Sequence, residues 1–369
     1  MGIRLPSSVA VGAKWTAGLL MLVAALGLVS RAVRARAGAT VSDLRLVQLT
    51  FDGPGIANQF PQVSPDGRYV IFQRCDTPLV NKSVTGKTTY TFKEGANWDI
   101  YRMRTDGADR VQLTDTPEVE DEATYSPDGA TIAYRTVRED NRSELFLMDA
   151  DGRNKRPLLA KPTMDLKTPA FSPDGRRLLF YGDREKTLSH VFSVDLSGQS
   201  VQQLTTGPYE DKHPQFTPDG THVIFHSNRK GVTIPVKGET KTWPTMGIFS
   251  LDVGTRQIRP LVTDSTDALQ DARHPFVSPD GRFIVYHAQT FGPDPSHPGS
   301  YKRLVENIYL MTRDGHRRVN LTEHDSRYFK HPSWSADGRG IYCVFADKHG
   351  QNVWNVAYID VSAALQHLM

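Results

Sequence analysis

Histidines recur at two fixed distances from a repeated tight turn, and this spacing makes them the first candidates for chemistry. The turn reads Ser/Thr-Pro-Asp-Gly, with alanine for proline in one copy. His213, His274 and His331 each stand four residues before the Ser or Thr of a turn, and proline follows each of them. His226 and His287 each stand six residues after the glycine of a turn. Random placement of 12 histidines would rarely give this repetition, so we expect the five side chains to act together.

A carboxylate and a guanidinium, Glu122 and Arg135, occupy the same two positions in another copy. Imidazoles from adjacent repeats could bind a divalent metal, zinc or manganese, with Glu122 as an oxygen ligand. The metal-ligand candidates are His213, His274 and His331. The cluster could instead bind an anionic or other non-metal ligand, or act as acid and base near neutral pH. A third interpretation is structural: each His-Pro pair caps the start of a strand and sets its angle.

The turn that positions these histidines is a strong local signal. Proline presets φ at the first corner, aspartate can bond its own backbone, and glycine accepts positive φ. A short β-branched and aromatic run follows each turn and alternates as a strand does. Recurrence at roughly 50 residues indicates a propeller or an array. The copies are Ser64–Gly67, Ser126–Gly129, Ser172–Gly175, Thr217–Gly220, Ser278–Gly281 and Ser335–Gly338.

Each unit has a second half, in which two strands are joined by a Gly-containing turn, as in residues 98–115. Four strands per unit and six units predict an all-β, six-bladed β-propeller, since radial repetition protects sheet edges. Residues 41–50 resemble a fourth strand without the first three, and residues 352–361 resemble a third strand without a fourth. We therefore expect the N-terminal strand to close the last blade.

Three units carry long insertions, at residues 76–97, 230–246 and 288–306. Each follows the second strand of its unit and precedes the third. Because strands of a blade alternate in direction, all three insertions should emerge on one face, at the same end as the histidines. Their Gly, Pro, Lys and Thr content predicts exposed loops. A functional face around one mouth of the central channel is the resulting hypothesis.

The N-terminus is a separate element. Residues 15–30 form an uncharged apolar run that is short for a membrane-spanning helix and fits a signal-peptide core. Arg31, Arg34 and Arg36 follow the run and disfavour export. Three outcomes stay open: a cleaved signal, which we expect, an uncleaved anchor with the propeller outside, and a propeller in the cytoplasm. The predicted organisation is a signal peptide or membrane anchor at residues 1–37 and a propeller at residues 41–369, in a periplasmic or other extracytoplasmic location.

Charge and cysteine content narrow the partners. Lys and Arg total 44 against 41 Asp and Glu, a net charge of +3, which argues against a dedicated nucleic-acid surface. Cys75 and Cys343 fall in the first and sixth units, which would be neighbours in a closed ring. Relative to their turns they are three positions out of register, which disfavours a disulfide. We expect a monomer.

The repeats resemble those of TolB-type propellers, also called PD40 or WD40-like repeats. The resemblance rests on the turns and on the phrases YRMRTDG, FLMDADG and YLMTRDG with VQLT or VNLT, and it covers residues 41–365. Proteins with this repeat include bacterial scaffolds, prolyl-oligopeptidase-like peptidases and oligogalacturonate lyases, so the resemblance implies a fold and not an activity. The chain has no G-x-S-x-G nucleophile motif, no α/β domain precedes the propeller as in TolB, and the lyase metal ligands have no residue-by-residue match.

The sequence therefore predicts an exported, non-catalytic propeller scaffold that binds a protein or glycan in the cell envelope through its insertion-bearing face. The alternative is a metal-assisted polysaccharide lyase or hydrolase, of the oligogalacturonate type, with the histidines at the channel mouth. The candidate site residues are His213, His226, His274, His287, His331, Glu122 and Arg135.

Overall fold

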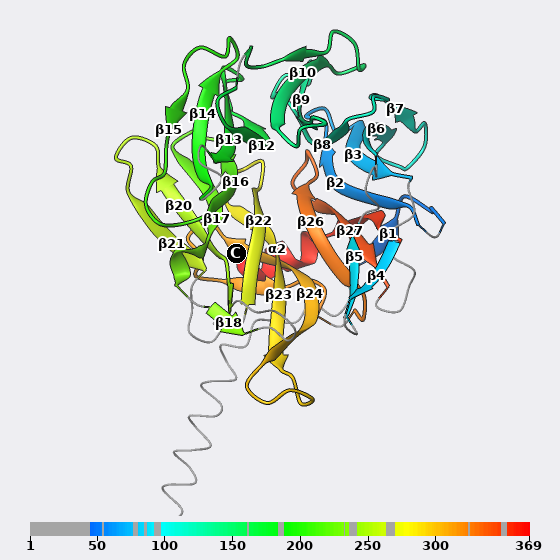
Figure 1. Cartoon of the computed structure of the whole chain (residues 1–369), viewed down its shortest axis with the longest axis vertical. Coiled ribbons are helices and arrows are strands. Elements are labelled where there is room, and N and C mark those ends of the chain that lie inside the picture. Colours follow the sequence, from blue (N-terminus) through cyan, green and yellow to red (C-terminus); the bar gives the residue numbers. More distant parts are fainter. Residues whose placement is uncertain are drawn as a thin grey trace, which may run out of the picture. The chain divides into compact units, whose positions relative to one another are not determined.

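Six four-stranded antiparallel sheets surround a common centre, which confirms the six-bladed β-propeller (Figure 1). The innermost strand of each sheet contacts the innermost strands of both neighbouring sheets, so the ring is closed. The computed structural model describes residues 45–53, 55–76, 80–84, 87–91, 97–160, 162–183, 188–231, 233–235, 242–262, 270–323, 325–347 and 353–369.

The first three blades follow one another along the chain, each with its innermost strand first. Blade 1 contains β2 (Ala57–Val63), β3 (Tyr69–Cys75), β6 (Trp98–Arg104) and β7 (Val111–Gln112). Blade 2 contains β8 (Val119–Tyr125), β9 (Thr131–Val137), β10 (Ser143–Asp149) and β11 (Arg156–Pro157). Blade 3 contains β12 (Asp165–Phe171), β13 (Arg177–Asp183), β14 (His190–Asp195) and β15 (Gln202–Gln203).

The last three blades repeat this order, except that the outermost strand of blade 6 comes from the other end of the chain. Blade 4 contains β16 (Asp211–Phe216), β17 (His222–Ser227), β20 (Gly247–Asp252) and β21 (Ile258–Val262). Blade 5 contains β22 (Gln270–Val277), β23 (Phe283–Pro293), β24 (Tyr301–Thr312) and β25 (Arg318–Asn320). Blade 6 contains β26 (Tyr328–Trp334), β27 (Gly340–Ala346), β28 (Asn355–Asp360) and β1 (Leu46–Gln48).

Closure by the N-terminal strand is confirmed. β1 pairs antiparallel with β28, with Leu46 opposite Ile359. The Thr50 hydroxyl accepts a hydrogen bond from the Val356 N–H at 2.9 Å and donates one to the Asn355 side chain at 3.0 Å. Residues 41–44 of the predicted strand, and the predicted signal or anchor at residues 1–37, lie outside the described residues. None of the helices in the described part of the chain has the length and hydropathy of a membrane span.

The repeated turns form as their residue types predict. In blade 1 the Gly67 N–H donates to the Ser64 carbonyl at 2.9 Å, and Gly67 adopts a φ of 72°. The Ser64 hydroxyl donates to the Asp66 carboxylate at 2.6 Å and accepts from the Tyr69 N–H at 3.0 Å. The same bonds recur at the other turns, for example at Ser278. Each turn therefore fixes the register of the two innermost strands of its blade.

Apolar side chains on the facing sheets fill the space between blades. Between the first two blades, Ile71 of β3 packs with Tyr134 of β9, and each is at most 1% exposed. Burial of this kind contributes about 25 cal/mol per Å² of apolar surface. Cys75 and Cys343 are buried and form no disulfide, so apolar contact joins the first and last blades without one.

The insertions are not the irregular loops that we expected. The first carries a hairpin of β4 (Val80–Val84) and β5 (Lys87–Thr91). The second carries the short helix η1 (Asn228–Lys230) and a hairpin of β18 (Thr233–Pro235) and β19 (Thr242–Pro244). The third extends β23 and β24 into a long hairpin that projects from the fold (Figure 1). β-Branched residues and long antiparallel pairing outweigh the turn-forming composition in these segments.

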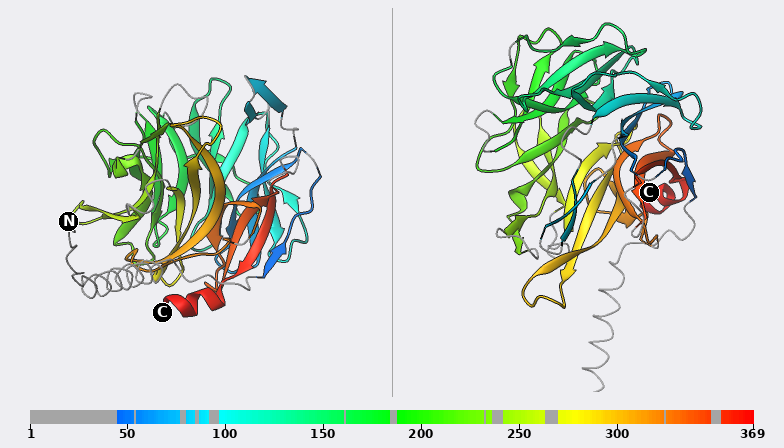
Figure 2. Two further views of the ribbon diagram at one scale, coloured as in Figure 1. Left: turned by 90° about the horizontal axis from the view of Figure 1, so that it is seen from below. Right: turned by 45° about the vertical axis from the view of Figure 1, so that its right-hand side comes forward.

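The C-terminal helix α2 (Ser362–Leu368) was also not expected. Ala364 and Leu368 are buried in an apolar cluster with residues of the last two blades, such as Val319 and Ile359. The helix lies beside the propeller in both views of Figure 2, coloured red. A segment of only seven residues carries too short a pattern for a helix to be recognised.

Candidate functional site

The innermost strand of every blade breaks its register at the same place. Between the register pairs on either side, two residues of the inner strand oppose one residue of its partner, which is a β-bulge. The first bulge residue adopts a left-handed φ of 49° to 51° in all six blades. These residues are Phe60, Glu122, Thr168, His213, His274 and His331. They are the six residues that stand four positions before the turns.

Left-handed backbone costs a non-glycine residue about 1 kcal/mol, and here it recurs six times. Proline follows the bulge residue in five blades, and Ala123 follows it in blade 2. Because the second bulge residue is left without a ladder partner, a residue that lacks an N–H is suited to this position. The Pro after each histidine is thus explained by the bulge, and the bulge redirects the preceding side chain.

The five predicted histidines meet at the centre of the ring. Ring centroids lie 3.9 Å apart for His213 and His274, 4.6 Å for His274 and His287, and 4.8 Å for His274 and His331. The His226 ring lies 5.0 Å from that of His213. The sequence prediction that these side chains come together is therefore correct in geometry. The proximity of the five histidines does not by itself identify their function.

A chain of side-chain contacts runs through the cluster. The Thr168 hydroxyl lies 3.3 Å from His213 Nδ1, and His213 Nε2 lies 2.9 Å from His274 Nε2. His274 Nδ1 lies 3.2 Å from His287 Nδ1, and His287 Nε2 lies 3.5 Å from a Glu306 carboxylate oxygen. One set of neutral tautomers satisfies the three hydrogen-bond contacts: Thr168 donates to His213, His213 donates to His274, and His274 donates to His287 Nδ1. The remaining ring N–H of His287, on Nε2, then faces Glu306. The cluster can therefore be fully neutral and still be hydrogen-bonded.

The two histidine positions have different roles. His226 Nδ1 accepts a hydrogen bond from the His274 N–H at 3.2 Å, and His287 Nδ1 accepts one from the His331 N–H at 3.4 Å. Gln73 does the same for the Glu122 N–H in blade 1, at 2.9 Å. Side chains at this second position thus join blades 1, 4 and 5 to the bulge of the next blade. His226 and His287 are 1% exposed and support the structural interpretation.

Burial makes these imidazoles resist protonation. It lowers the pKa of His213, His226, His274 and His331 well below the ordinary value of 6.5, and neighbouring charges and imidazoles add to the effect. The rings are therefore neutral at physiological pH. Neutral imidazoles offer one donor and one acceptor each, so the cluster suits polar, uncharged groups better than it suits an anion.

An aromatic ring that the prediction left out covers the cluster. Phe60 of blade 1 stacks on the His331 ring with centroids 3.8 Å apart, and meets the His274 ring edge-on at 5.4 Å. Tyr181 of blade 3 lies 5.4 Å from the His213 ring. Both residues occupy the two aligned positions, so the signal for them was present in the sequence. Charge and metal-ligand chemistry select only the polar residues at these positions, so they do not identify the aromatic members.

Glu122 and Arg135 occupy the same two aligned positions in blade 2, but both already interact with other residues of the protein. Arg135 donates to both carboxylate oxygens of Asp121 and lies 3.6 Å from Glu122. Glu122 also accepts from the Thr168 N–H at 2.8 Å. Burial alone would lower the pKa of Arg135, but the two carboxylates outweigh it and raise the pKa above its ordinary value. The guanidinium is charged and compensated, so it is poorly placed to attract an anionic ligand.

The arrangement of the three bulge histidines does not fit a metal centre. Their nitrogens meet in pairs, as in His213 Nε2 with His274 Nε2, rather than converging on one point. No group of three or more His, Cys, Asp or Glu side chains in the described ranges could hold a metal ion. The metal prediction for His213, His274 and His331 stays a prediction, and we derive no chemical step from it.

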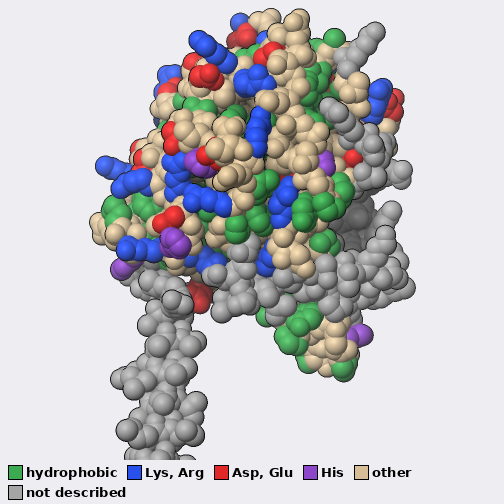
Figure 3. Space-filling view, turned by 90° about the vertical axis from the view of Figure 1, so that its left-hand side faces the viewer, with side chains coloured by type: hydrophobic (Ala, Val, Ile, Leu, Met, Phe, Trp, Pro, Cys, Tyr) green, Lys and Arg blue, Asp and Glu red, His purple; other side chains and the backbone are tan. Residues whose placement is uncertain are grey.

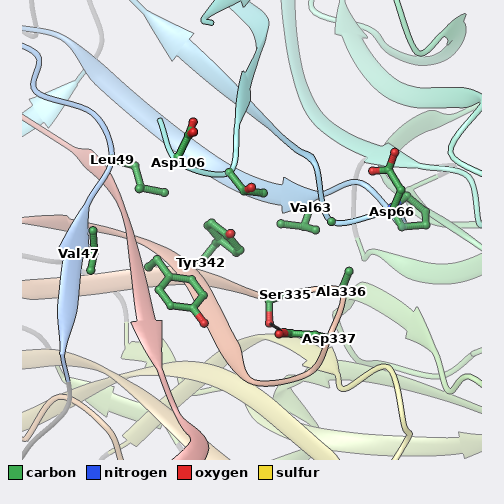
Figure 4. Close-up of a pocket in the computed structure, with 13 residues that line it drawn as sticks. Val47, Leu49, Val63, Asp66, Asp106, Ser335, Ala336, Asp337 and Tyr342 are labelled. Atoms are coloured by element: carbon green, nitrogen blue, oxygen red, sulfur yellow. Dashed lines mark hydrogen bonds between the residues drawn. The ribbon is translucent and has the colours of Figure 1, made fainter. Parts of the chain in front are cut away.

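A pocket of about 760 Å³ lies where the ring closes, at the turns rather than at the insertions (Figure 4). Val47, Leu49 and Tyr342 form its apolar wall, and Asp66 and Asp337 lie at the turns that border it. Elsewhere the proline of one turn contacts the turn glycine of the next blade, as Pro65 contacts the position of Gly129. At the seam the smaller Ala336 takes the proline's place, which leaves space. The sequence shows that Ala336 replaces the proline of the other turns, but it does not show that a pocket results.

The outer surface carries both signs of charge. On the side shown in Figure 3, Lys and Arg side chains are interspersed with acidic, apolar and other side chains. This distribution agrees with the nearly balanced composition of the chain, which has a net charge of +3.

Several solved structures have a fold similar to that of this chain. A protein from Agrobacterium tumefaciens that is assigned to TolB has 19% sequence identity and a TM-score of 0.56, over 86% of this chain and 99% of that one. TolB from Acinetobacter baumannii has 16% identity and a TM-score of 0.50, over 83% and 79%. Oligogalacturonate lyase from Vibrio parahaemolyticus has 14% identity and a TM-score of 0.50, over 88% and 96%. At these identities the likeness shows the fold alone.

No curated protein matches the chain. The model of the TolB beta propeller domain, PD40, matches residues 82–290. The match spans blades 2 to 4 and parts of blades 1 and 5, which carry the repeated turns. Together with the six four-stranded sheets, it shows that the chain belongs to the TolB beta propeller domain family.

Proposed function

We propose that this protein is an exported propeller scaffold that binds a ligand of the cell envelope, a glycan or a protein segment, without catalysing a reaction on it. The binding site is the channel end formed by the six bulge residues, on the insertion-bearing face. Membership in the TolB beta propeller domain family supports the scaffold role, since proteins with this repeat include bacterial scaffolds. We further propose a periplasmic or other extracytoplasmic location, a monomeric state and no nucleic-acid partner.

One observation carries the proposal. Consecutive blades bring His213, His274 and His331 together in strained backbone, and the cluster keeps hydrogen-bonding atoms without partners. His331 Nδ1 and His226 Nε2 are buried and have no hydrogen-bond partner. An unsatisfied buried polar atom costs about 1–3 kcal/mol. A ligand that supplies the missing donor and acceptor would recover this cost.

The chemistry of the cluster indicates the kind of ligand. Neutral imidazoles and the Thr168 hydroxyl offer paired donors and acceptors, while Phe60 offers an apolar ring face. Sugar hydroxyls and backbone amides match such donors and acceptors, and a sugar ring or side chain can pack on an aromatic face. His213 and His274 keep part of their surface exposed, so they are the members that an incoming ligand would meet first.

Calorimetric titration of the purified propeller tests the proposal. Soluble N-acetylglucosamine oligomers and galacturonate oligomers serve as neutral and acidic glycan probes. We expect saturable binding of at least one probe, with neutral sugars favoured because Arg135 is compensated. A protein that binds neither class at millimolar concentrations contradicts the glycan form of the proposal, and peptides of envelope proteins then test the protein form.

The lyase or hydrolase alternative rests on the same imidazoles. Its specific support is the contact chain from His213 to Glu306, because linked imidazoles could move a proton away from a bound sugar. Metal content and activity decide between the two functions. Zinc or manganese in the purified protein, together with an unsaturated product from galacturonate oligomers, would favour the lyase.

Export has its own test. Residues 1–45 are fused to a reporter that is active only outside the cytoplasm, and we expect a positive signal because residues 15–30 have the length of a signal core. An intact fusion that stays silent in the cytoplasm contradicts export. It would leave the binding proposal standing with a cytoplasmic ligand.

A further inference from the structure

The boundary between blades 1 and 2 contains two acidic side chains, whereas two equivalent boundaries have a compensated pair and a neutral pair. Asp99 is the second residue of the third strand of blade 1, and Glu120 stands two residues before the bulge of blade 2. Asp99, His190 and Asn355 are equivalent, because each precedes a residue whose N–H donates to a threonine hydroxyl. Their partners in the next blade, two residues before the bulge, are Glu120, Asp211 and Asn58.

The equivalent boundaries show how the fold normally treats an acid here. Between blades 3 and 4, Asp211 is bonded by Arg229 at 2.7 Å and lies 3.7 Å from His190. Between blades 6 and 1, the side chains are the neutral amides Asn355 and Asn58, which bond to Thr50 and its neighbours. Only compensated or neutral pairs occur at these two boundaries.

Asp99 and Glu120 have no such compensation among the described residues. Thr114 donates to Asp99 at 3.3 Å, Asn97 donates to it at 3.4 Å, and Thr116 donates to Glu120 at 2.9 Å. The two bonds to Asp99 are longer than usual for their types. Lys155 acts on Glu120 only through space, and its ammonium group is bonded to the Gly152 carbonyl at 2.7 Å.

Two oxygen atoms at this boundary are buried and have no hydrogen-bond partner: Glu120 Oε2 and Asn97 Oδ1. Glu120 is 3% exposed, so its carboxylate is held away from water. The carboxylates of buried Glu120 and half-buried Asp99 have no cation bonded to them among the described residues, so they repel each other and Glu120 loses hydration.

We propose that Asp99 and Glu120, with the side-chain oxygens of Asn97 and Thr114, bind a calcium ion between the first two blades. All of these donors are hard oxygen atoms, and calcium accepts six to eight such ligands in irregular geometry, with water completing the set. The two carboxylates neutralise the ion. Asn97 and Asp99 are partly exposed, which gives the ion a route in from solvent. The bound ion joins two blades at the point where the chain returns from the first insertion.

Thermal unfolding of the full propeller tests the site. The protein is freed of metal with a chelator, and its melting temperature is measured at pH 7.5 with and without 1 mM calcium chloride. We expect a rise of about 5 °C, the size given by ligand at roughly a hundred times its dissociation constant. Terbium luminescence, sensitised by the adjacent Trp98, gives a second readout that does not depend on stability.

Variants show whether any effect belongs to this site. Glu120→Gln removes one charge at constant size, so it should raise the metal-free melting temperature and abolish both the calcium shift and the terbium signal. Glu144→Gln is the matched control, since Glu144 is the second residue of the third strand of blade 2, as Asp99 is in blade 1, and is paired with Arg138 at 3.1 Å. It should keep both responses.

Three results would overturn the proposal. The wild type could show no calcium shift and no terbium signal, in which case the carboxylates share a proton instead. The Glu120→Gln variant could keep the full calcium shift, which would place the ion elsewhere. The Glu144→Gln control could lose the shift as well, which would show a general effect of charge.

Discussion

The histidines at the channel divide into two kinds, and the division follows from which atoms they use. His226 and His287 accept backbone N–H groups of the next blade, so they belong to the framework. His213, His274 and His331 stand at the bulges, where the backbone is left-handed and their rings face one another. The sequence pattern predicted that all five would meet. It could not separate these roles, since tautomers and acceptor atoms depend on neighbours in adjacent blades, far away in the sequence.

Acid should destabilise the protein through the buried imidazoles. The pKa of His226 lies well below 6.5 in the folded state because of burial. An unfolded chain takes up protons below about pH 6.5, whereas folded His226 stays neutral. Its stabilising contribution is therefore complete above that pH and is lost as the pH falls towards the folded pKa. Each such group contributes a slope of about 1.4 kcal/mol per pH unit within this window.

The His226→Gln variant isolates this effect. Glutamine can accept the His274 N–H as Gln73 accepts the Glu122 N–H in blade 1. We predict an unfolding free energy close to wild type at pH 8 and a shallower decline between pH 6.5 and 5, by about 1.4 kcal/mol per pH unit at most. Urea unfolding across this pH range is the measurement. Equal slopes for variant and wild type would show that His226 is not held neutral by the fold.

At the scale of helices and strands, the elements that depend on residues close together in the sequence were predicted correctly. The turns from Ser64 to Gly338, the strands beside them and the closing strand β1 were all predicted, because residue types within a few positions determine them. The hairpins of the insertions and α2 were missed, because their formation depends on pairing and burial that short segments do not reveal. The pocket at the seam depends on Ala336 facing Gly67 of another blade, a contact between opposite ends of the chain.

Closing strand β1 should be required for stability. Its removal exposes the β28 edge and deletes Thr50, which bonds Asn355 and Val356. We predict that deletion of residues 41–50 lowers the melting temperature sharply and broadens the transition. Differential scanning calorimetry of the deleted and full propellers measures this. An unchanged melting curve would mean that the ring stays closed without the N-terminal strand.

The turn of blade 6 offers the opposite test, a gain in stability. Five turns have proline at the position of Ala336, and no hydrogen bond from the Ala336 N–H is lost on substitution. Ala336→Pro should therefore stabilise the protein by about 0.4–1 kcal/mol by restricting the unfolded chain. The pyrrolidine ring of the introduced proline should also reduce the volume of the pocket beside Ala336. A fall in the melting temperature would show that Ala336 cannot adopt the backbone angles of the other turns.

For the whole molecule, the repeats determine the closed propeller fold, whereas the function depends on particular side chains at the channel. Repeats and family membership establish a six-bladed propeller, and one strand from the N-terminus completes it. Solved relatives at 14–19% identity include both TolB proteins and a lyase, so the fold is compatible with either class of function. Only the side chains at the channel distinguish them, and their present arrangement supports binding by neutral hydrogen-bonding groups.

Replacing His213, His274 and His331 together by glutamine tests this central claim most directly. Glutamine keeps polarity and approximate size but lacks the imidazole ring. A control variant with His222, His316 and His367 changed to glutamine carries the same number of substitutions away from the channel and from the insertions. Binding of whichever glycan or peptide probe the wild type recognises is measured by calorimetry, beside the melting temperature of each protein. The account predicts that the channel variant folds nearly as stably as wild type and loses binding at least tenfold, while the control keeps it. A channel variant that binds as tightly as wild type, or that loses several kcal/mol of stability while the wild type binds no probe, would contradict it.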